Sequence, residues 1–254
     1  MMKVNFLGTG TSQGIPVIGC ECEVCKSKNP KDKRLRSSLL VSVDDNNIII
    51  DTSIDFRMQM LRAGTKHLEA ILYTHEHKDH TAGLDDVRAF NFIQNRPMDI
   101  YAENRVIRAL NREFEYVFAE KKYPGIPQIN PNIIDDNKIK IETIDATPLR
   151  VMHNRLPIYG YRIGDMAYIT DASHIPDETR TYLHGLKLLI LGAIRKEKHY
   201  SHFCLEEALD EISKIKPEKA AITHIGHNMG LYDEVQKELP ENVFLSYDGL
   251  KIEM

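Results

Sequence analysis

The sequence predicts an α/β fold in which two layers of sheet carry helices on their outer faces. Short apolar or β-branched segments recur along the chain between turn signals, as strands do. Segments with apolar residues spaced three and four apart lie between many of them, as amphipathic helices do. The expected strands are too many for one small sheet, so we expect two sheet layers.

The expected strands are apolar or alternating runs bounded by turn residues, and they cover residues 3–8, 37–43, 47–51, 69–74, 98–102, 138–143, 149–153, 159–164, 166–170, 186–191, 220–224 and 242–247. The expected helices cover residues 55–63, 80–92, 103–118, 176–184, 201–214 and 231–239. Residues 121–137 are rich in Pro and Asn, which predicts a long loop and therefore a candidate substrate lid.

The chain as a whole has the composition of an ordinary globular protein. It has 254 residues, 42% hydrophobic and 28% charged, and we expect one domain over residues 1–254. No apolar run approaches the roughly 18 residues of a membrane helix, and no secretion signal is evident, so the cytoplasm is the expected compartment. The net charge of −4 disfavours a broad nucleic-acid-binding surface. The basic stretch 26–36 is interpreted as a solvated surface loop.

The segment YTHEHKDH, residues 73–80, predicts a metal site. His75 and His77 are two apart in extended chain, so they point the same way and can share one cation. Asp79 and His80 follow where the chain turns into a helix, and they can hold a second cation nearby. A run of exposed polar loop residues is the alternative, and the density of histidine makes it the weaker one.

Three further candidate ligands, His153, Asp171 and His224, each come just after an apolar strand. Any one of them alone would more often be a hydrogen-bonded polar residue than a ligand. Their shared position favours a site, because functional groups in layered α/β folds gather on loops at strand ends.

The motif HEHKDH, with the three later residues, resembles the metallo-β-lactamase superfamily over essentially the whole chain. The resemblance implies a four-layer αββα sandwich, the metallo-β-lactamase fold. It also implies two catalytic divalent metals, manganese or zinc. The implied ligands are His75, His77 and His153 on one metal, Asp79, His80 and His224 on the other, and Asp171 bridging both.

A second cluster, Cys20, Cys22 and Cys25, has the spacing to wrap one tetrahedral zinc. Its fourth ligand is missing from the cluster, and His227 is the better candidate. Cys204 lies in an apolar helical pattern, where a free cysteine usually packs. A redox or unpaired thiol cluster is the alternative.

Residues 8–25 are similar to the opening of the phosphoribosyl 1,2-cyclic phosphate phosphodiesterases, a branch of the superfamily with an extra structural zinc. In that branch the zinc is bound by such a cysteine cluster and by a histidine just after the last active-site histidine. The resemblance therefore implies an N-terminal structural zinc loop, and His227 fits the place of its histidine.

The expected reaction is hydrolysis of a small cyclic phosphodiester, such as 5-phosphoribosyl 1,2-cyclic phosphate, by a hydroxide that bridges the two metals. His202 is expected at the start of a helix, where backbone N–H groups favour an anion. The resemblance implies that it faces the substrate phosphate. Asp79 is also assigned to catalysis, Asp51 is expected to orient the metal loop, and His199 and Lys198 are treated as surface residues.

Other functions stay open. A nuclease or cyclic-nucleotide phosphodiesterase of the tRNA 3′-processing type shares the HxHxDH core, but no long Gly- and Pro-rich arm is evident. A zinc-stapled interaction module without turnover comes from another class, and the presence of every expected ligand disfavours it. The expected partner is a small-molecule phosphodiester, with nucleic acid less favoured and no membrane. A homodimer is common in this superfamily.

Overall fold

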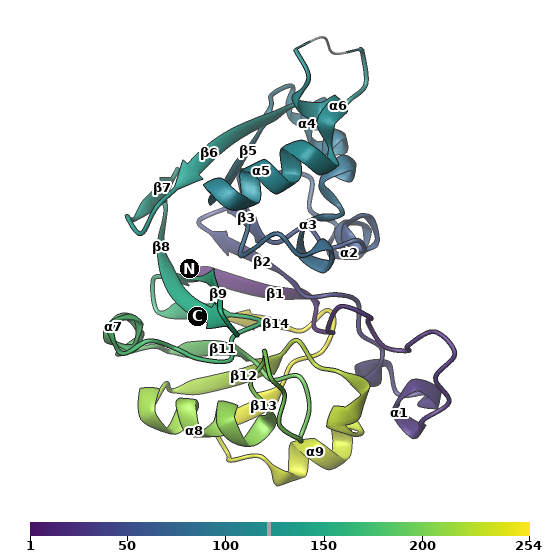
Figure 1. Ribbon diagram of the computed structural model, residues 1–254, viewed down its shortest axis with the longest axis vertical. Coiled ribbons are helices and arrows are strands. Elements are labelled where there is room, and N and C mark those ends of the chain that lie inside the picture. The colour runs from purple at the N-terminus through teal and green to yellow at the C-terminus, as the bar shows by residue number, and fades with distance from the viewer. Residues whose placement is uncertain (121–122) are drawn as a thin grey trace.

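The computed structural model describes residues 1–120 and 123–254, and in it two seven-stranded sheets face each other. The first sheet has the order β14-β1-β2-β3-β4-β5-β6, and the second has the order β13-β12-β11-β10-β9-β8-β7. Helices cover the outer face of each sheet (Figure 1). This arrangement confirms the predicted four-layer αββα sandwich.

The strands of the first sheet are β1 (Met2–Gly8), β2 (Ser38–Val43), β3 (Asn46–Ile50), β4 (Ala70–Leu72), β5 (Met98–Glu103), β6 (Ile129–Ile134) and β14 (Lys251–Glu253). The strands of the second sheet are β7 (Ile139–Ile141), β8 (Ile144–His153), β9 (Leu156–Ile163), β10 (Met166–Ile169), β11 (Leu188–Gly192), β12 (Lys219–Thr223) and β13 (Val243–Leu245).

The α-helices are α1 (Glu23–Lys26), α2 (Phe56–Ala63), α3 (Lys78–Thr81), α4 (Arg88–Gln94), α5 (Asn104–Glu113), α6 (Glu115–Phe118), α7 (Asp177–Arg180), α8 (Leu205–Ile215) and α9 (Tyr232–Glu238). Short 3₁₀ helices are η1 (Pro30–Asp32), η2 (Leu84–Val87), η3 (Thr181–Leu183) and η4 (His227–Met229). The loop that carries α1 projects beside the two sheets (Figure 1).

Three apolar cores hold the layers together. The central core lies between the sheets and joins residues such as Phe6 and Ile50 of the first to Tyr161 and Ile190 of the second. A second core packs α2, α4 and α5 on the first sheet, and a third packs α8 and α9 on the second. A strand that is buried on both faces has a continuous run of apolar residues, and such runs allowed these strands to be predicted from the sequence.

Parallel pairing brings the candidate functional residues to one edge of the sandwich. In the first sheet β3, β4, β5 and β6 run parallel, and in the second β10, β11, β12 and β13 do. Strand β8 is antiparallel to β9, which is antiparallel to β10, so β8 runs in the same direction as β10. Loops that follow these strands therefore meet at the same end.

The predicted loop over residues 121–137 is wrong in its second half, because Ile129–Ile134 forms β6 and pairs with β5. Strand β6 is the edge of its sheet, and only there is Pro131 tolerated, since proline cannot donate to a second neighbour. The Pro and Asn residues of this segment therefore predicted a loop where the chain forms an edge strand. Lys121 and Lys122, which begin the expected lid, lie outside the described residues.

The predicted helix over residues 80–92 is three short pieces, α3, η2 and α4. Gly83 lies at the break, where a Cβ atom would come within 2.2 Å of the Ser53 carbonyl oxygen. The chain passes so close to Ser53 that only glycine fits, and the turn it makes there starts η2.

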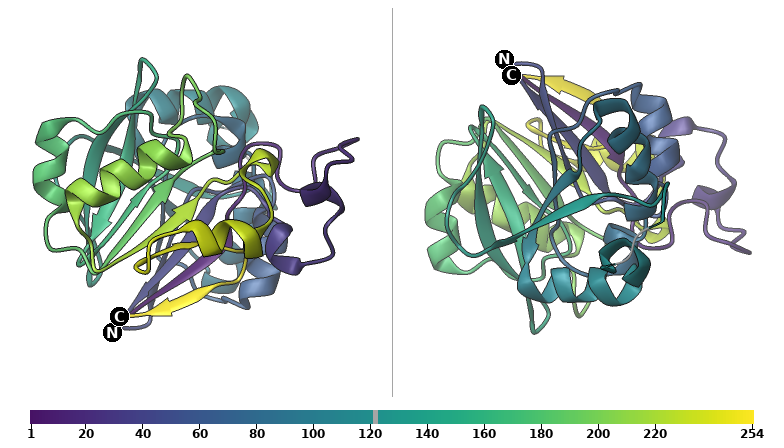
Figure 2. Two further views of the ribbon diagram at one scale, coloured as in Figure 1. Left: turned by 90° about the horizontal axis from the view of Figure 1, so that it is seen from below. Right: turned by 90° about the horizontal axis from the view of Figure 1, so that it is seen from above.

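The two termini lie side by side, as both views of Figure 2 show. Strand β1 pairs with β14 in antiparallel register, and the Met2 amide donates to the Met254 carbonyl at 2.9 Å. No helix in the described part of the chain has the length and apolarity to cross a membrane.

Two hydrogen bonds tie the second sheet directly to the exit of β4. The Tyr161 hydroxyl donates to the Tyr73 carbonyl at 2.6 Å, and the Tyr159 amide donates to the Thr74 carbonyl at 3.1 Å. Both tyrosine side chains from β9 are buried, and so is Tyr73. The loop that begins at His75 is therefore anchored by both sheets.

We expect Tyr161→Phe to lower the free energy of unfolding by about 1–2 kcal/mol, because it removes a buried hydroxyl donor and leaves the Tyr73 carbonyl unpaired. Tyr168→Phe is the matched control, since no described residue hydrogen-bonds the buried Tyr168 hydroxyl. Urea denaturation of both variants measures the difference. Equal losses in the two variants would contradict the anchoring role of Tyr161.

Candidate metal centres

The segment after β4 brings its histidines together as the chain turns into α3. The rings of His75 and His77 lie 4.5 Å apart between centroids, and those of His75 and His80 lie 4.3 Å apart. His75 and His80 are fully buried, whereas His77 is partly open to solvent. The side of the cluster that carries His77 therefore faces outward.

Asp171, directly after β10 and the residue Thr170, lies at the centre of the site. Its Oδ1 atom is 3.3 Å from His80 Nε2 and 3.2 Å from His224 Nδ1. Its Oδ2 atom is 3.9 Å from His75 Nε2 and 3.9 Å from His202 Nδ1. The two oxygens of one carboxylate thus face two different groups of histidines.

Two sets of candidate ligand atoms converge on this carboxylate, each within 4.8 Å: Asp79, His80, Asp171 and His224, and His153, Asp171 and His202. The first set matches the grouping expected from the sequence. In the second, His202 takes the place beside His153 where His75 and His77 were expected. Those two are nevertheless neighbours of His153, with ring centroids 5.7 and 5.2 Å away.

The buried nitrogens of this cluster fit divalent cations. His75 Nε2 and His80 Nε2 make no hydrogen bond with any described residue, although both are shielded from solvent. The other ring nitrogen of each is occupied, His75 Nδ1 by Thr74 Oγ1 at 2.9 Å and His80 Nδ1 by Asp51 Oδ2 at 2.7 Å. A buried, unpaired imidazole nitrogen is costly unless a cation accepts its lone pair.

Asp51, which follows β3, fixes the start of the metal loop. The Thr74 amide donates to the Asp51 Oδ1 at 2.8 Å, and the Thr74 hydroxyl donates to Oδ2 at 2.8 Å. His80 Nδ1 is hydrogen-bonded to the same Oδ2 at 2.7 Å. With a proton on Nδ1, His80 presents Nε2 to the centre of the cluster. The orienting role expected for Asp51 has this geometry.

The remaining rings are oriented in the same way by neighbours that carried no signal in the sequence. His153 Nδ1 lies 2.7 Å from the Asp171 carbonyl and 2.8 Å from the Ser201 carbonyl, so it donates and leaves Nε2 free. His224 Nδ1 lies 3.1 Å from the Ser37 hydroxyl, which itself donates to the Gly10 carbonyl. Thr74, Ser37 and Ser201 look like ordinary polar residues in the sequence, and only the folded chain brings them to the histidines.

Charge balance at the site follows from these contacts. Burial lowers the pKa of His75 well below its usual value. Burial acts in the same direction on His80, but the carboxylates of Asp171, Asp79 and Asp51 outweigh it and raise the His80 pKa well above its usual value. Burial would raise the pKa of Asp171, yet the surrounding His224 and His80 hold it well below. The Asp171 carboxylate is therefore ionised and draws positive charge.

Three residues of the site adopt left-handed backbone, with φ of 65° at Asp51, 56° at Asp171 and 55° at His224. Each comes at the end of a parallel strand, where the left-handed turn aims the side chain across the edge of the sheets. Such backbone is uncommon for residues other than glycine and costs of order 1 kcal/mol or more. It persists here because the contacts around each side chain compensate for it.

His202 was predicted at the start of a helix, but it lies in a bend that precedes α8. Cys204 is the residue that caps α8, and the Phe203 amide donates to the Ala172 carbonyl at 2.7 Å, which fixes the segment against the loop after β10. The His202 ring lies 4.7 Å from that of His153 and is stacked on that of His224 at 5.1 Å. Burial lowers its pKa to about 3.

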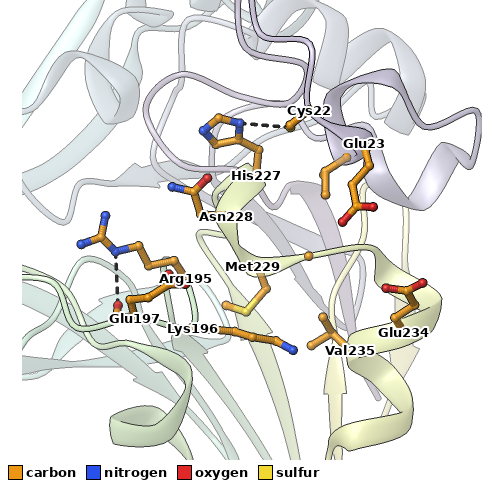
Figure 3. Close-up of a pocket in the computed structure, with 12 residues that line it drawn as sticks. Cys22, Glu23, Arg195, Lys196, Glu197, His227, Asn228, Met229, Glu234 and Val235 are labelled. Carbon is orange, nitrogen blue, oxygen red and sulfur yellow. Dashed lines mark hydrogen bonds between the residues drawn. The ribbon is translucent and has the colours of Figure 1, made fainter.

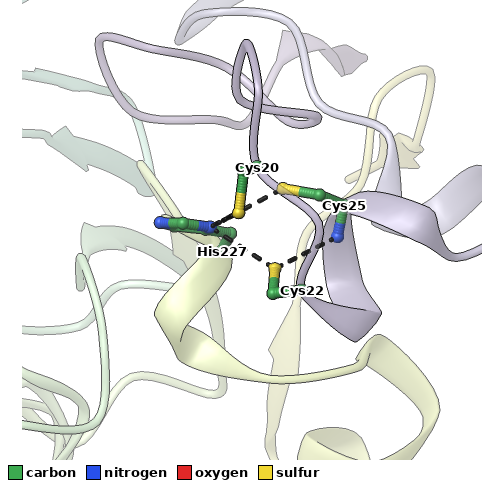
Figure 4. A group of neighbouring side chains, drawn as sticks. All are labelled: Cys20, Cys22, Cys25 and His227. Carbon is green, nitrogen blue, oxygen red and sulfur yellow. Dashed lines mark hydrogen bonds between the residues drawn. The ribbon is translucent and has the colours of Figure 1, made fainter.

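The cysteine cluster closes around His227, as Figure 4 shows. The sulfurs of Cys20, Cys22 and Cys25 lie 3.2, 3.5 and 3.6 Å from His227 Nδ1. The Cys25 backbone N–H, at the start of α1, lowers the pKa of Cys22 to about 6, so this thiol is readily ionised. Three sulfurs and one imidazole nitrogen at these separations are the donor set of a structural zinc.

The two centres are joined by one short segment, since His224 belongs to the first and His227 to the second. Between them, the Ile225 amide donates to the Thr9 carbonyl at 2.8 Å and the Thr11 amide donates to the Ile225 carbonyl at 3.2 Å. The loop after β1, which leads on to the cysteines, is thus paired with the segment that carries His224.

Part of the basic stretch 26–36 is buried rather than solvated, which corrects the surface-loop interpretation. Arg34 is 4% exposed and donates to the Thr9 hydroxyl at 2.8 Å and to the Ser246 carbonyl at 2.6 Å. Asp248 lies nearby and accepts from the Thr9 and Leu35 amides. The charge of Arg34 stabilises the fold around the loop after β1 and is not offered to a ligand.

A cavity of about 640 Å³ lies beside the cysteine cluster, lined by residues that include Cys22, His227, Asn228, Arg195 and Glu234 (Figure 3). It lies between the loop that carries α1, the segment that follows β11 and the start of α9. Arg195 turns back onto its own loop and donates to the Glu197 carbonyl at 3.2 Å. Its lining mixes both signs of charge, so the cavity has no single charge preference.

Comparison with known proteins agrees with this geometry. A family model described as a beta-lactamase superfamily domain matches residues 46–225. Among solved structures, a diphosphatase from the PhnP family has a TM-score of 0.94 and 39% sequence identity, with 100% of this chain and 98% of that chain covered. Human tRNase Z, short form, has a TM-score of 0.72 at 18% identity, with 99% and 98% covered, and at that identity it shows the fold alone.

Among curated proteins, an octanoyltransferase of Porphyromonas gingivalis is 40% identical over 253 residues, which is 98% of this chain and 51% of that protein. The chain spans about half the length of the curated relatives it matches. The rest of the longer protein lies outside the match, so its name describes a chain that contains much more than this fold.

We expect Cys22→Ser to lower the occupancy of the structural site and also to reduce binding at the Asp171 centre, because the loop from Cys22 is paired with the segment that holds His224. Cys204→Ser is the matched control. It removes a thiol outside the cluster and leaves a serine, a good helix cap, before α8. Elemental analysis of the purified variants measures metals per chain. Loss of one zinc with full activity would contradict the coupling.

Proposed function

This chain belongs to the beta-lactamase superfamily and, within it, to the PhnP family, and from this membership we propose that it is a metal-dependent phosphodiesterase. The observation that carries the proposal is the cluster around Asp171. There, two buried imidazole nitrogens lack hydrogen bonds with the described residues and histidines face both carboxylate oxygens. Imidazole nitrogens and a carboxylate in this arrangement are suited to bind a pair of divalent cations.

We assign the ligands as follows: His75, His77 and His153 to one cation, Asp79, His80 and His224 to the other, and Asp171 to both. The distances from Asp171 to His75, His80 and His224 support this division. Nitrogen and carboxylate donors accept either manganese or zinc. The three cysteines and His227 are assigned to a separate structural zinc, for which their sulfur donors are suited.

Two bound cations would supply hydroxide at neutral pH and would neutralise the anionic oxygens of a phosphodiester. The protein residues do the rest. Asp79 is ionised because His80, beside it, outweighs the effect of burial and lowers its pKa below the usual range. We assign it to accept a hydrogen bond from an attacking water as well as to ligate. Asp51 and Ser37 hold the ligand rings in orientation through their ring N–H groups.

His202 is the proposed hydrogen-bond donor to the substrate phosphate. Its ring lies next to those of His153 and His224, and 12% of its side-chain surface is exposed to solvent. Because burial lowers its pKa to about 3, the ring is neutral at pH 7 before substrate binds. It can still donate one N–H, and an anionic phosphate beside it favours the protonated form.

The proposed substrate is a small phosphodiester on ribose, with 5-phosphoribosyl 1,2-cyclic phosphate as the first compound to test. The 39% identical PhnP-family diphosphatase supports a reaction at phosphorus over one at a carbonyl carbon. Nuclease action on tRNA is the second candidate, supported by the fold shared with tRNase Z. The net charge of −4 favours the small substrate, since a nucleic-acid surface usually carries basic excess.

Phosphorus NMR of manganese-loaded protein tests the proposal with 5-phosphoribosyl 1,2-cyclic phosphate, nucleoside 2′,3′-cyclic phosphates and a short RNA. Ring opening of the small cyclic esters is expected. Cleavage of RNA alone would replace the proposal by a nuclease. No turnover of any phosphodiester, with one metal per chain, would favour a zinc-stapled interaction module.

We expect His202→Ala to keep its metals and to lose roughly a hundredfold or more in turnover, the cost of one lost transition-state donor. His184→Ala is the control, because that histidine is exposed and lies outside the cluster. Steady-state rates and metal content are measured on the same preparations. Wild-type turnover in the His202 variant would remove this residue from the reaction.

A further inference from the structure

The segment between β11 and α8, residues 193–204, carries an exposed tyrosine beside the proposed catalytic centre. We propose that His199 and Tyr200 form a stacking platform for an aromatic base, so that the enzyme prefers a nucleoside phosphodiester over a base-free ribose phosphate. This inference rests on the proposed phosphodiesterase function and names the class of its substrate.

A continuous row of rings leads from the metal cluster to this tyrosine. His224 is buried, and His202 is stacked on it at 5.1 Å with an interplanar angle of 15°. The next ring, His199, is 5.1 Å from His202, and Tyr200 is stacked on His199 at 4.7 Å and 30°. Solvent exposure increases along the row, from the buried His224 to Tyr200, which is 79% exposed.

The Tyr200 ring is supported on one face and open on the other. His199 covers the first face, and its Nδ1 lies 3.3 Å from both the Ser201 amide and the Ser201 hydroxyl, which holds the imidazole in place. A flat, positioned aromatic face is what a nucleobase stacks on, whichever base it is. His199 was predicted to be a surface residue; it is half-buried, and its ring neighbours those of both His202 and Tyr200.

The spacing suits a nucleoside. The ring centroids of His202 and His199 are 5.1 Å apart and those of His199 and Tyr200 are 4.7 Å apart, so Tyr200 is two rings away from the proposed phosphate donor. In a nucleotide the ribose carries the base away from the phosphate, toward such a neighbouring ring. A base-free ribose phosphate ends before it reaches the tyrosine.

The same segment offers positive charge. Lys196 is paired with Glu238 at 2.6 Å, and Arg195 is occupied by the Glu197 and Lys198 carbonyls. Lys198, by contrast, makes no ion pair with the carboxylates of residues 1–120 and 123–254, and it is exposed next to His199. A free ammonium on the same segment as an exposed aromatic ring suits a ligand that is both flat and anionic.

Kinetics on two substrates tests the inference: adenosine 2′,3′-cyclic phosphate, which has a base, and 5-phosphoribosyl 1,2-cyclic phosphate, which does not. We expect Tyr200→Ala to raise KM for the adenosine ester about tenfold, with kcat changed little, because one base–aromatic stack is lost. KM for the base-free ester stays unchanged. Tyr200→Phe keeps the stacking face and restores the wild-type values.

Tyr182→Ala is the matched control, because Tyr182 is 55% exposed but lies in η3, outside the row of rings. A Tyr200→Ala variant that leaves both KM values unchanged, or raises both equally, overturns the platform. Calorimetric titration with adenosine 5′-monophosphate and ribose 5-phosphate gives a readout that needs no turnover. Tighter binding of the adenosine compound to wild type, lost in Tyr200→Ala, supports the platform even if neither cyclic ester is hydrolysed, and equal binding overturns it.

Discussion

One buried carboxylate, Asp171, sets the requirements that the surrounding structure meets. It is buried at the edge where the two sheets meet, and an uncompensated negative charge is expensive there. Histidines from both sheets face its two oxygens. The parallel strands bring these side chains to one edge, and the left-handed backbone at Asp171 itself turns the carboxylate toward them. The fold therefore brings together the same side chains that balance the charge of Asp171.

The cysteine cluster links the N-terminal part of the chain to the site around Asp171. A single strand end carries His224 to the first centre and His227 to the second, and the loop after β1 is hydrogen-bonded along it. Arg34 and Asp248 fix the same loop, because both form hydrogen bonds with Thr9. A disturbance at the sulfurs therefore reaches the reaction centre through backbone pairing, without any contact between the two sets of ligands.

Sequence patterns predicted the layers, most strands and the residues that gather around Asp171, because apolar runs and histidine spacing are local signals. Strand β6 was hidden, since its edge position permits a proline that argues against a strand. Ser37 and Thr74 were also hidden, because their roles depend on partners distant in the chain. The ring contacts of His199 were hidden for the same reason, since its tilted neighbour His202 and its stacked neighbour Tyr200 meet it only in the folded chain.

The distance along the chain between Cys20 and His227, 207 residues, has a consequence for folding. Contacts this far apart carry a high loop-closure cost, so the complete ligand sets exist only when the sheets that bring them together are in place. Neither cluster can then select a cation during early collapse, and scattered thiols and imidazoles of the unfolded chain are free to bind the wrong one. Correct loading of the two proposed metal sites therefore depends on the finished fold, so the order in which metals are offered during refolding should decide how much active material is recovered.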